Sequence, residues 1–389
     1  MTFDETRRLL ESAGLRTILL QGDEGNGCLL IAPELSGRIM AVSMSGPHGE
    51  NFGFVKPEAV LNRGADPQFN AYGGALRWWV GPEGGQYGIA FPPGTKNFDL
   101  DSWYISEEYN GKPFAVSYPE SGVGASTLMD AEFRVENASG TPFHVEVTCR
   151  LSLLEDPLAR GRERSRTGGR TRRESGLHHL GYLSETTFEN LSSEPMRKET
   201  GLVSIWMLGM YVAGPHTYVI APFERTGTGK IVTDTYFSAG GIGGDRLIVK
   251  QRQGYLLFRA DARERSKIGL SRSRASTAIG SIDLSANLLT VWKFPVRRKM
   301  PYVNSLWEHQ KHPYAGDVSN SYNDGGAFGD FYELECSSHA LALQPQEGFT
   351  FPLEIHHYQG AREQLLRATD KLLGVRCRSF LNTLASSGT

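Results

Sequence analysis

The sequence predicts an all-β protein in which two large antiparallel sheets pack face to face. About fifteen short segments are rich in β-branched or aromatic residues and are bounded by Gly, Pro, Asn or Ser. The 389 residues include 45 Gly and 19 Pro, a composition typical of many strands joined by tight turns. No helical segment long enough for the crossover of a parallel sheet is predicted between the strands, which favours antiparallel pairing.

The strands are predicted, in chain order, at 27–32, 38–43, 86–91, 114–118, 127–134, 143–153, 181–189, 202–207, 217–223, 246–251, 254–259, 288–294, 330–336, 339–344 and 349–358. A short helix is predicted at 4–13, with Thr2 or Asp4 near its N-cap and Gly14 at its end. Leucines at helical spacing predict a short C-terminal helix at 361–373, followed by Gly374 as a cap. We expect one domain over 1–375 and a flexible tail over 376–389.

Composition excludes several classes of protein. Lys and Arg total 41 against 43 Asp and Glu, so the net charge of −2 does not favour a nucleic-acid partner. With 39% hydrophobic and 22% charged residues, we expect no membrane-spanning bundle. The first twenty residues lack the apolar core of a signal peptide, which predicts a cytoplasmic protein, or a periplasmic or secreted one if a signal has been removed. The four widely spaced cysteines are expected to be free thiols.

One segment, 160–173 (RGRERSRTGGRTRR), departs sharply from the average composition. It has almost no apolar residue to bury, so we expect a mobile, solvated loop. The alternative is an arm that binds phosphate groups or a partner, although the rest of the chain is correspondingly acidic.

Aromatic, charged and glycine residues cluster in 73–91 (GGALRWWVGPEGGQYGIAF). Arg77, Trp78, Trp79 and Glu83 supply a cation, flat apolar rings and a carboxylate. Sugars need this combination, because their hydroxyls take planar hydrogen-bonding partners and their C–H faces lie on aromatic rings. On a strand, Arg77 and Trp79 would share one face and Trp78 would take the other. The alternative is that one tryptophan belongs to the core and the glycines only form turns.

A second polar cluster lies in 302–324 (YVNSLWEHQKHPYAGDVSNSYND), a stretch predicted to be a loop. Its candidate site residues are Trp307, His309, Asn320, Asn323 and Asp324. Polar crowding beside an aromatic residue is typical of a site on loops over a rigid sheet. A surface loop stabilised by Asx turns is the alternative for the last three. The two histidines of the segment are three residues apart, but no third ligand is fixed by spacing, so we expect no metal.

Two carboxylates stand two residues apart in the predicted strand 330–336. Glu333 and Glu335 therefore share one face, opposite an apolar face that resembles core. If that shared face borders a cleft, burial would raise the pKa of at least one carboxyl group, as a general acid or base requires. If the face is open, the two groups are ordinary solvated charges.

Four blocks together resemble a known family. They are GGALRWWVGPEGGQYGIAF, ETGLVSIWMLGMY at 199–211, YVNSLWEHQKHPYAGDVSNSYNDGG and FYELECSSHALALQPQEGF. In order and spacing, over residues 20–360, they are similar to an uncharacterised bacterial family of the galactose-mutarotase-like, or aldose 1-epimerase-like, superfamily. The resemblance implies a β-supersandwich of antiparallel sheets with a carbohydrate-sized cleft on a concave sheet face.

The resemblance also implies catalytic positions. In mutarotases a glutamate on a late strand removes the anomeric hydroxyl proton and a histidine protonates the ring oxygen. Glu335 resembles that glutamate, with Glu333 as the fallback. Trp206 stands where the histidine is expected, and His309 is the candidate substitute if its loop folds over the same cleft.

The sequence thus predicts a protein that binds a small sugar or oligosaccharide, without a cofactor. The binding residues are expected to be Arg77, Trp78, Trp79, Glu83, Trp206, Trp307, Asn320, Asn323 and Asp324. If the protein is an enzyme, Glu335, Glu333 and His309 would transfer protons at an anomeric centre. The alternative is a non-catalytic carbohydrate-recognition protein, which the tryptophan at the expected histidine position favours.

Overall fold

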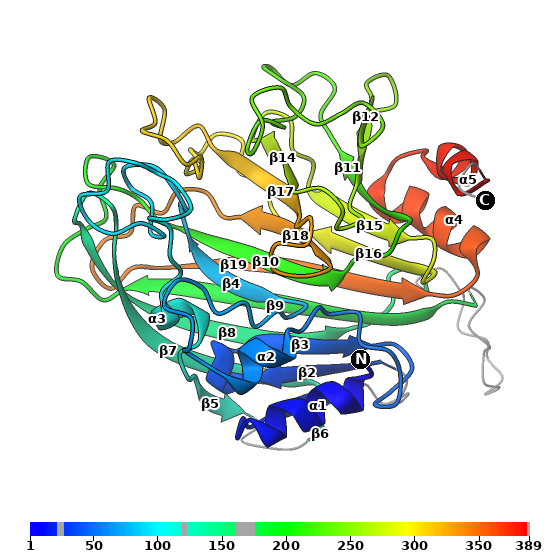
Figure 1. Cartoon of the computed structure of the whole chain (residues 1–389), viewed down its shortest axis with the longest axis horizontal. Coiled ribbons are helices and arrows are strands. Elements are labelled where there is room, and N and C mark those ends of the chain that lie inside the picture. The colour runs from blue at the N-terminus through cyan, green and yellow to red at the C-terminus, as the bar shows by residue number, and fades with distance from the viewer. Residues whose placement is uncertain (22–26, 119–122, 160–175, 387–389) are drawn as a thin grey trace, which may run out of the picture.

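The computed structural model describes residues 1–21, 27–118, 123–159 and 176–386, and in this part of the chain it contains three β-sheets (Figure 1). Strand pairing is antiparallel except between β1 and β6. These sheets confirm the predicted all-β class. The Arg-rich segment 160–173 falls outside the described residues.

A ten-stranded sheet forms the broad base of the molecule. Its order is β12-β13-β11-β15-β16-β19-β9-β8-β7-β5. The strands are β5 (Ala115–Tyr118), β7 (Ser126–Glu136), β8 (Pro142–Leu154), β9 (His178–Asn190), β11 (Thr217–Pro222), β12 (Leu247–Lys250), β13 (Tyr255–Arg259), β15 (Ala278–Asp283), β16 (Leu288–Lys293) and β19 (Gly348–Gln359). On β8, Val145, Val147, Cys149 and Leu151 alternate with more exposed residues, as expected for a strand with one face on a core.

A five-stranded sheet lies over the ten-stranded one and carries the site described below. Its order is β14-β17-β18-β10-β4, with strands β4 (Arg77–Gly81), β10 (Ser204–Val212), β14 (Ser266–Ser271), β17 (Asp317–Asn323) and β18 (Phe331–Ser337). The core lies between the two sheets. The indole N–H of Trp292 on β16 donates to the Tyr211 hydroxyl on β10 at 3.0 Å, and the Ser281 and Tyr332 hydroxyls lie 2.7 Å apart.

A four-stranded sheet, β3-β2-β1-β6, lies at the lower edge in Figure 1. It contains β1 (Ile18–Gln21), β2 (Cys28–Ala32), β3 (Arg38–Ser43) and β6 (Val123–Gly124). Helix α1 (Phe3–Ser12) covers it, with Phe3 and Leu10 in a small core shared with β2 and β3. Thr2 caps α1 through a capping box with Glu5, which confirms the helix predicted at 4–13.

The remaining helices are short and lie around the sheets. They are the 3₁₀ turn η1 (Pro33–Leu35), α2 (Pro57–Leu61), α3 (Glu107–Asn110), α4 (Arg362–Leu373) and α5 (Arg378–Ser386). Helix α4 confirms the prediction at 361–373 and packs Leu365 and Leu366 on the outer face of the ten-stranded sheet. Gly374 ends it in the left-handed conformation, at φ 67°. No helix of the described residues is both long and apolar enough to cross a membrane.

Some predicted elements differ from the structure. The tail expected to be flexible over 376–389 contains α5, because Leu381 is buried beside α4. Residues 86–91 and 339–344 are not strands. In the first, the amides of Ile89 and Ala90 donate to the carbonyls of Pro82 and Glu83, so turn bonds replace a sheet ladder. The predicted loop 302–324 ends in β17. The strands β1, β6, β14 and β15 were also not among those predicted, and β4 was foreseen only in the alternation described for Arg77 and Trp79.

Candidate functional site

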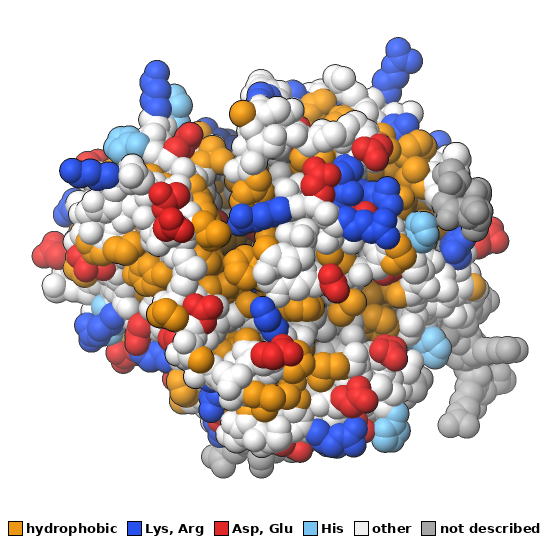
Figure 2. All heavy atoms as spheres, in the orientation of Figure 1, with side chains coloured by type: hydrophobic (Ala, Val, Ile, Leu, Met, Phe, Trp, Pro, Cys, Tyr) orange, Lys and Arg blue, Asp and Glu red, His pale blue; other side chains and the backbone are white. Residues whose placement is uncertain are grey.

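A pocket opens on the face of the five-stranded sheet that points away from the core, and it encloses about 580 Å³ counted out to its mouth. Figure 2 shows this face of the molecule hollowed near its centre, where hydrophobic side chains gather around cationic ones. The lining residues are Phe69, Arg77, Trp79, Glu83, Leu100, Trp103, Trp206, Leu208, Met210, Phe237, Arg265, Lys267, Trp307, Tyr322, Phe328, Phe331 and Glu333.

Strand register brings the floor of the pocket together. Trp79 on β4 pairs with Trp206 on β10, and Arg77 pairs with Leu208. On its other side, β10 pairs Met210 with Glu333 of β18. Because side chains alternate along a strand, these residues all point to the same face of the sheet. Side chains from three neighbouring strands, two tryptophans, an arginine and a glutamate among them, thus form one continuous polar and aromatic floor.

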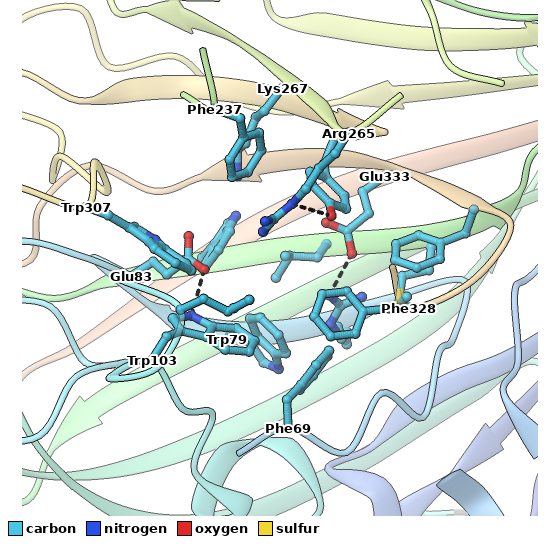
Figure 3. Close-up of a pocket in the computed structure, with 17 residues that line it drawn as sticks. Phe69, Trp79, Glu83, Trp103, Phe237, Arg265, Lys267, Trp307, Phe328 and Glu333 are labelled. Carbon is cyan, nitrogen blue, oxygen red and sulfur yellow. Dashed lines mark hydrogen bonds and ion pairs between the residues drawn. The ribbon is translucent and has the colours of Figure 1, made fainter. Parts of the chain in front are cut away.

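Aromatic rings cover part of the floor and continue into one wall. Trp79 and Trp206 meet edge to face with ring centroids 5.7 Å apart, and Trp103 and Trp307 stack at 5.8 Å. Phe69 contacts both groups, with its ring centroid 5.8 Å from Trp79 and 5.3 Å from Trp103 (Figure 3). Rings that hold one another in fixed orientations offer flat surfaces on which the C–H face of a ligand can lie.

Two buried ion pairs cross the floor. Arg77 Nη2 lies 2.8 Å from Glu333 Oε1, and Lys267 Nζ lies 2.9 Å from Glu335 Oε2. The indole N–H of Trp206 also donates to Glu335 Oε2, at 3.0 Å. All four charged side chains are at most 9% exposed, so each needs the opposite charge of its partner to offset the cost of leaving water.

Burial shifts the ionisation of the pocket residues. It raises the pKa of Glu333, because Arg77 offsets the effect only in part and the Glu335 carboxylate adds to it. Burial also raises the pKa of Glu83, against the attraction of Lys267 and the hydrogen bonds of Trp307 and Trp103. For Lys267, burial alone would lower the pKa, but the carboxylates of Glu335 and Glu83 outweigh it and raise the pKa. The pocket therefore favours a charged ammonium beside carboxyl groups that hold protons more readily than usual.

Several buried polar atoms of the site have no hydrogen-bond partner among the described residues. They are Nε and Nη1 of Arg77, Nε1 of Trp79 and Oε1 of Glu335. Arg77 and Trp79 are each only 4% exposed and both line the pocket. Buried donors are almost always satisfied in folded proteins, so the N–H groups of Arg77 and Trp79 mark places where a ligand can supply the missing partners.

The family model that matches residues 1–383 is that of a family of unknown function, DUF6786. The chain belongs to DUF6786. No curated protein sequence matches it.

Solved structures similar to this DUF6786 chain share its fold. A protein from Escherichia coli K12, provisionally assigned as an aldose 1-epimerase, has a TM-score of 0.50 at 12% identity, over 88% of this chain and 99% of its own. The Slr1438 protein from Synechocystis sp. PCC 6803 has a TM-score of 0.50 at 11% identity, over 89% of this chain and 96% of its own. At these identities the similarity shows the fold alone. It confirms the predicted mutarotase-like sandwich.

The structure brings together part of the predicted site of this DUF6786 protein. Six of the candidates line the pocket: Arg77, Trp79, Glu83, Trp206, Trp307 and Glu333. Glu335 lies just beneath, fully buried against Lys267. Trp78 is not with them. It points into the core, where its ring centroid lies 5.3 Å from Phe133 and 5.5 Å from Phe188.

His309 is not at the pocket, which corrects the expectation that it would act beside the glutamates. Its side chain is exposed on the loop. The next residue, Gln310, is buried instead, and its side-chain N–H group donates to the carbonyls of Asn304 and Leu306 at 2.8 Å each and of Gly84 at 3.3 Å. Because Gln310 anchors the loop inward, His309 turns outward.

The polar residues of β17 support the site and do not line it. Asn320 donates to the Tyr236 hydroxyl and to a backbone carbonyl of β14. Asn323 accepts from the amide of Ala262 at 2.7 Å and so fastens the segment that leads into β14. The expectation that these side chains contact the ligand is corrected accordingly, since their hydrogen bonds are used within the protein.

Asp324 likewise holds the protein together and does not line the pocket. It accepts hydrogen bonds from the Tyr322 hydroxyl at 2.8 Å and from the backbone amides of Phe328 and Gly329 at 2.7 and 3.1 Å. These are the loop-stabilising bonds of the alternative interpretation. Tyr322 and Phe328 themselves line the pocket, so Asp324 acts on the site only by positioning them.

The main residues that the sequence analysis missed are Lys267 and Arg265, on β14 and immediately before it. In RSKIGLS at 265–271, Arg265 and Lys267 alternate with Ile268 and Leu270, which is the signal that could have indicated a half-buried strand. Phe69 and Trp103 come from segments without periodicity, so no pattern pointed to them. In the described residues there is no cluster of three or more His, Cys, Asp or Glu that could hold a metal ion.

Proposed function

We propose that this chain binds a carbohydrate in the pocket over the five-stranded sheet. The observation that carries the proposal is that buried N–H groups of Arg77 and Trp79 have no hydrogen-bond partner, in a pocket lined by aromatic rings. An unsatisfied buried donor typically costs about 1–3 kcal/mol, and ligand hydroxyls would remove that cost. Few other small molecules combine many hydroxyl acceptors with an apolar C–H face. The likeness to a protein assigned as an aldose 1-epimerase adds support.

Each part of the pocket has a role in this proposal. The rings of Trp79 and Trp206 would stack on the C–H face of the sugar. Arg77 would donate its free N–H groups to hydroxyl oxygens, while its bond to Glu333 fixes its orientation. The carboxyl groups of Glu333 and Glu83 would accept hydrogen bonds from, or donate them to, further hydroxyls of the sugar.

Tryptophan fluorescence tests the proposal, because four of the six tryptophans of the chain line the pocket. Titration with a panel of monosaccharides and oligosaccharides should give saturable quenching by at least one sugar. The double substitution Arg77→Gln with Glu333→Gln removes both charges of one pair together, so no buried charge is left alone. It should weaken binding about tenfold or more. Arg134→Gln, an exposed site on β7, is the matched control. Absence of quenching by every sugar would contradict the proposal.

A second candidate function is proton transfer at the anomeric centre of that sugar. It is favoured by two pocket carboxyl groups with a raised pKa, Glu83 and Glu333, beside the charged Lys267. Glu333 on β18, which lines the pocket, would take the proton of the anomeric hydroxyl in place of Glu335, which is fully buried beneath it. Glu83, in the role first expected for His309, would give a proton to the ring oxygen as the bond from C1 to that oxygen breaks. Reclosure reverses both transfers, so no proton is gained or lost.

Polarimetry separates the two candidates. Mutarotation of a bound aldose faster than in buffer supports catalysis, and each proton-transfer group typically contributes 10²–10⁴-fold. Glu83→Gln should then remove the acceleration while the fluorescence response to the sugar remains. Saturable quenching without any acceleration of mutarotation would support the alternative, a protein that binds the sugar but does not catalyse its mutarotation.

A further inference from the structure

Arg265 differs from the other cations of the pocket in its lack of a carboxylate partner. Arg77 pairs with Glu333 and Lys267 pairs with Glu335. Among the described residues, none places a carboxylate oxygen within 4.0 Å of the Arg265 guanidinium. The other cations of the floor bond to a carboxylate directly, whereas Arg265 reaches one, Asp324, only through the Tyr322 hydroxyl.

The side chain of Arg265 is nevertheless held in a defined position. Its Nε donates to the Tyr322 hydroxyl at 3.2 Å, and its guanidinium carbon lies 4.2 Å from the ring centroid of Phe237. Tyr322 is fixed in turn by Asp324, at 2.8 Å. Figure 3 shows Arg265 across the pocket from Phe69 and Trp103. This support uses Nε and one face of the guanidinium, and it leaves the two terminal amino groups available for a ligand.

We propose that the pocket selects a sugar that carries a carboxylate, a hexuronic acid, and that Arg265 binds this group. The inference rests on the proposed function and names its substrate class. A planar guanidinium with two free amino groups matches the two oxygens of a carboxylate. The half-buried position strengthens this interaction relative to bulk water. A neutral hexose would leave the charge of Arg265 unmatched.

The remaining acidic group of the lining does not cancel this preference. Glu83 is held by the indole N–H of Trp103 at 3.1 Å. Burial raises its pKa, so it carries less negative charge than an exposed glutamate. The positive charge of Lys267 already attracts the Glu83 carboxylate. The carboxylate of a ligand at Arg265 would therefore bond directly to a guanidinium whose own link to a carboxylate, Asp324, is indirect and runs through the Tyr322 hydroxyl.

The experiment compares hexoses with the hexuronic acids of the same stereochemistry: glucose with glucuronic acid, galactose with galacturonic acid, and mannose with mannuronic acid. Hexose 6-phosphates form a third arm. Binding is measured by tryptophan fluorescence at constant ionic strength. At least one hexuronic acid should bind about tenfold tighter than its neutral hexose. Arg265→Gln should bring that ratio close to one, and Arg265→Lys should give an intermediate ratio. Arg263→Gln removes an exposed cation two residues away and should leave the ratio unchanged.

The outcomes separate this inference from the proposed function. Equal or tighter binding of the neutral hexose in every pair would overturn the inference and still support carbohydrate binding. An acid preference that survives Arg265→Gln would overturn the role of Arg265. Tighter binding of a 6-phosphate than of any hexuronic acid would overturn the assignment to a carboxylate. If no sugar binds at all, the proposed function fails, and the inference fails with it.

Discussion

Trp206 donates its indole N–H to the Glu335 carboxylate at 3.0 Å, across the pairing of β10 with β18. The two residues occupy the positions at which the family resemblance implies an acid and a base. An indole does not give up its proton, so this contact fixes Glu335 and cannot shuttle a proton to a ligand. With Lys267 on the same oxygen, Glu335 is held from two sides. Any proton transfer at this site must therefore use another donor.

We predict that Glu335→Gln destabilises the protein, because it leaves the buried ammonium of Lys267 without its charged partner. Removal of one member of a buried ion pair typically costs about 3–5 kcal/mol. Replacing both charges together, in Lys267→Met with Glu335→Gln, should recover a large part of that loss. Urea unfolding of the three proteins measures the difference.

The exposed pair of Glu363 with Arg367 on α4 is the matched control. Glu363→Gln should leave the unfolding midpoint unchanged within error, since both side chains are solvated. A Glu335→Gln protein as stable as the wild type would show that the buried pair does not compensate its own desolvation.

Adjacent tryptophans on β4 should give opposite results when each is changed to phenylalanine. Trp79 lines the pocket and its N–H has no partner, so Trp79→Phe should weaken sugar binding with little change in stability. Trp78 lies in the core and donates to the carbonyl of Ser36 at 3.1 Å. Trp78→Phe should therefore lower the unfolding free energy by about 1–3 kcal/mol and leave binding largely intact. The same effect of both changes on binding would argue against the proposed site.

The alternation of side chains on β4 and β18 could be predicted from the sequence because a strand has a fixed period of two. That period alone separates Trp79 from Trp78 and places Glu333 with Glu335. The end of α4 could be predicted in the same way, because a glycine after a helical segment is a local signal for a left-handed C-cap. These features are encoded within a few residues, so they need no knowledge of the rest of the fold.

The orientation of a loop is not encoded locally in this way. His309 and Gln310 are neighbours of similar polarity, and only the carbonyls that surround Gln310 in the folded chain decide that it is buried and His309 is not. Strand β14 was missed for a related reason. Gly269 interrupts its pattern, yet the strand requires it, since a Cβ there would lie 2.1 Å from Asp317 Oδ2. Lys267 is brought to the site by that close approach between strands.

We predict that His357 makes stability fall as the pH falls below about 6.5. Burial lowers the pKa of this histidine from 6.5 to about 3, so the folded protein keeps it neutral while the unfolded chain binds a proton between these values. The unfolded state therefore gains roughly 1.4 kcal/mol per pH unit in that window, or about 2 kcal/mol between pH 6.5 and 5. Urea unfolding at several pH values measures the slope.

His357→Gln should reduce this pH dependence, because glutamine does not titrate. His309→Gln is the control: that side chain is exposed, so its removal should leave the slope as it is in the wild type. The same pH dependence in the His357→Gln protein would assign the effect to other groups.

Gly209 controls how closely β10 approaches the core, and Gly209→Ala should affect both stability and the pocket. A Cβ at this position would lie 2.6 Å from the Ala75 carbonyl oxygen and 2.7 Å from the ring of Trp292, and neither neighbour can turn away. Overpacking of this kind typically costs about 1–3 kcal/mol. Leu208 and Met210 on either side line the pocket, so a displaced strand should also weaken sugar binding. Gly244→Ala, where nothing lies within 4 Å, should change neither property. Unfolding and fluorescence titration of both variants measure the two effects, and a Gly209→Ala protein that matches the wild type in both would show that β10 can move away from the core without cost.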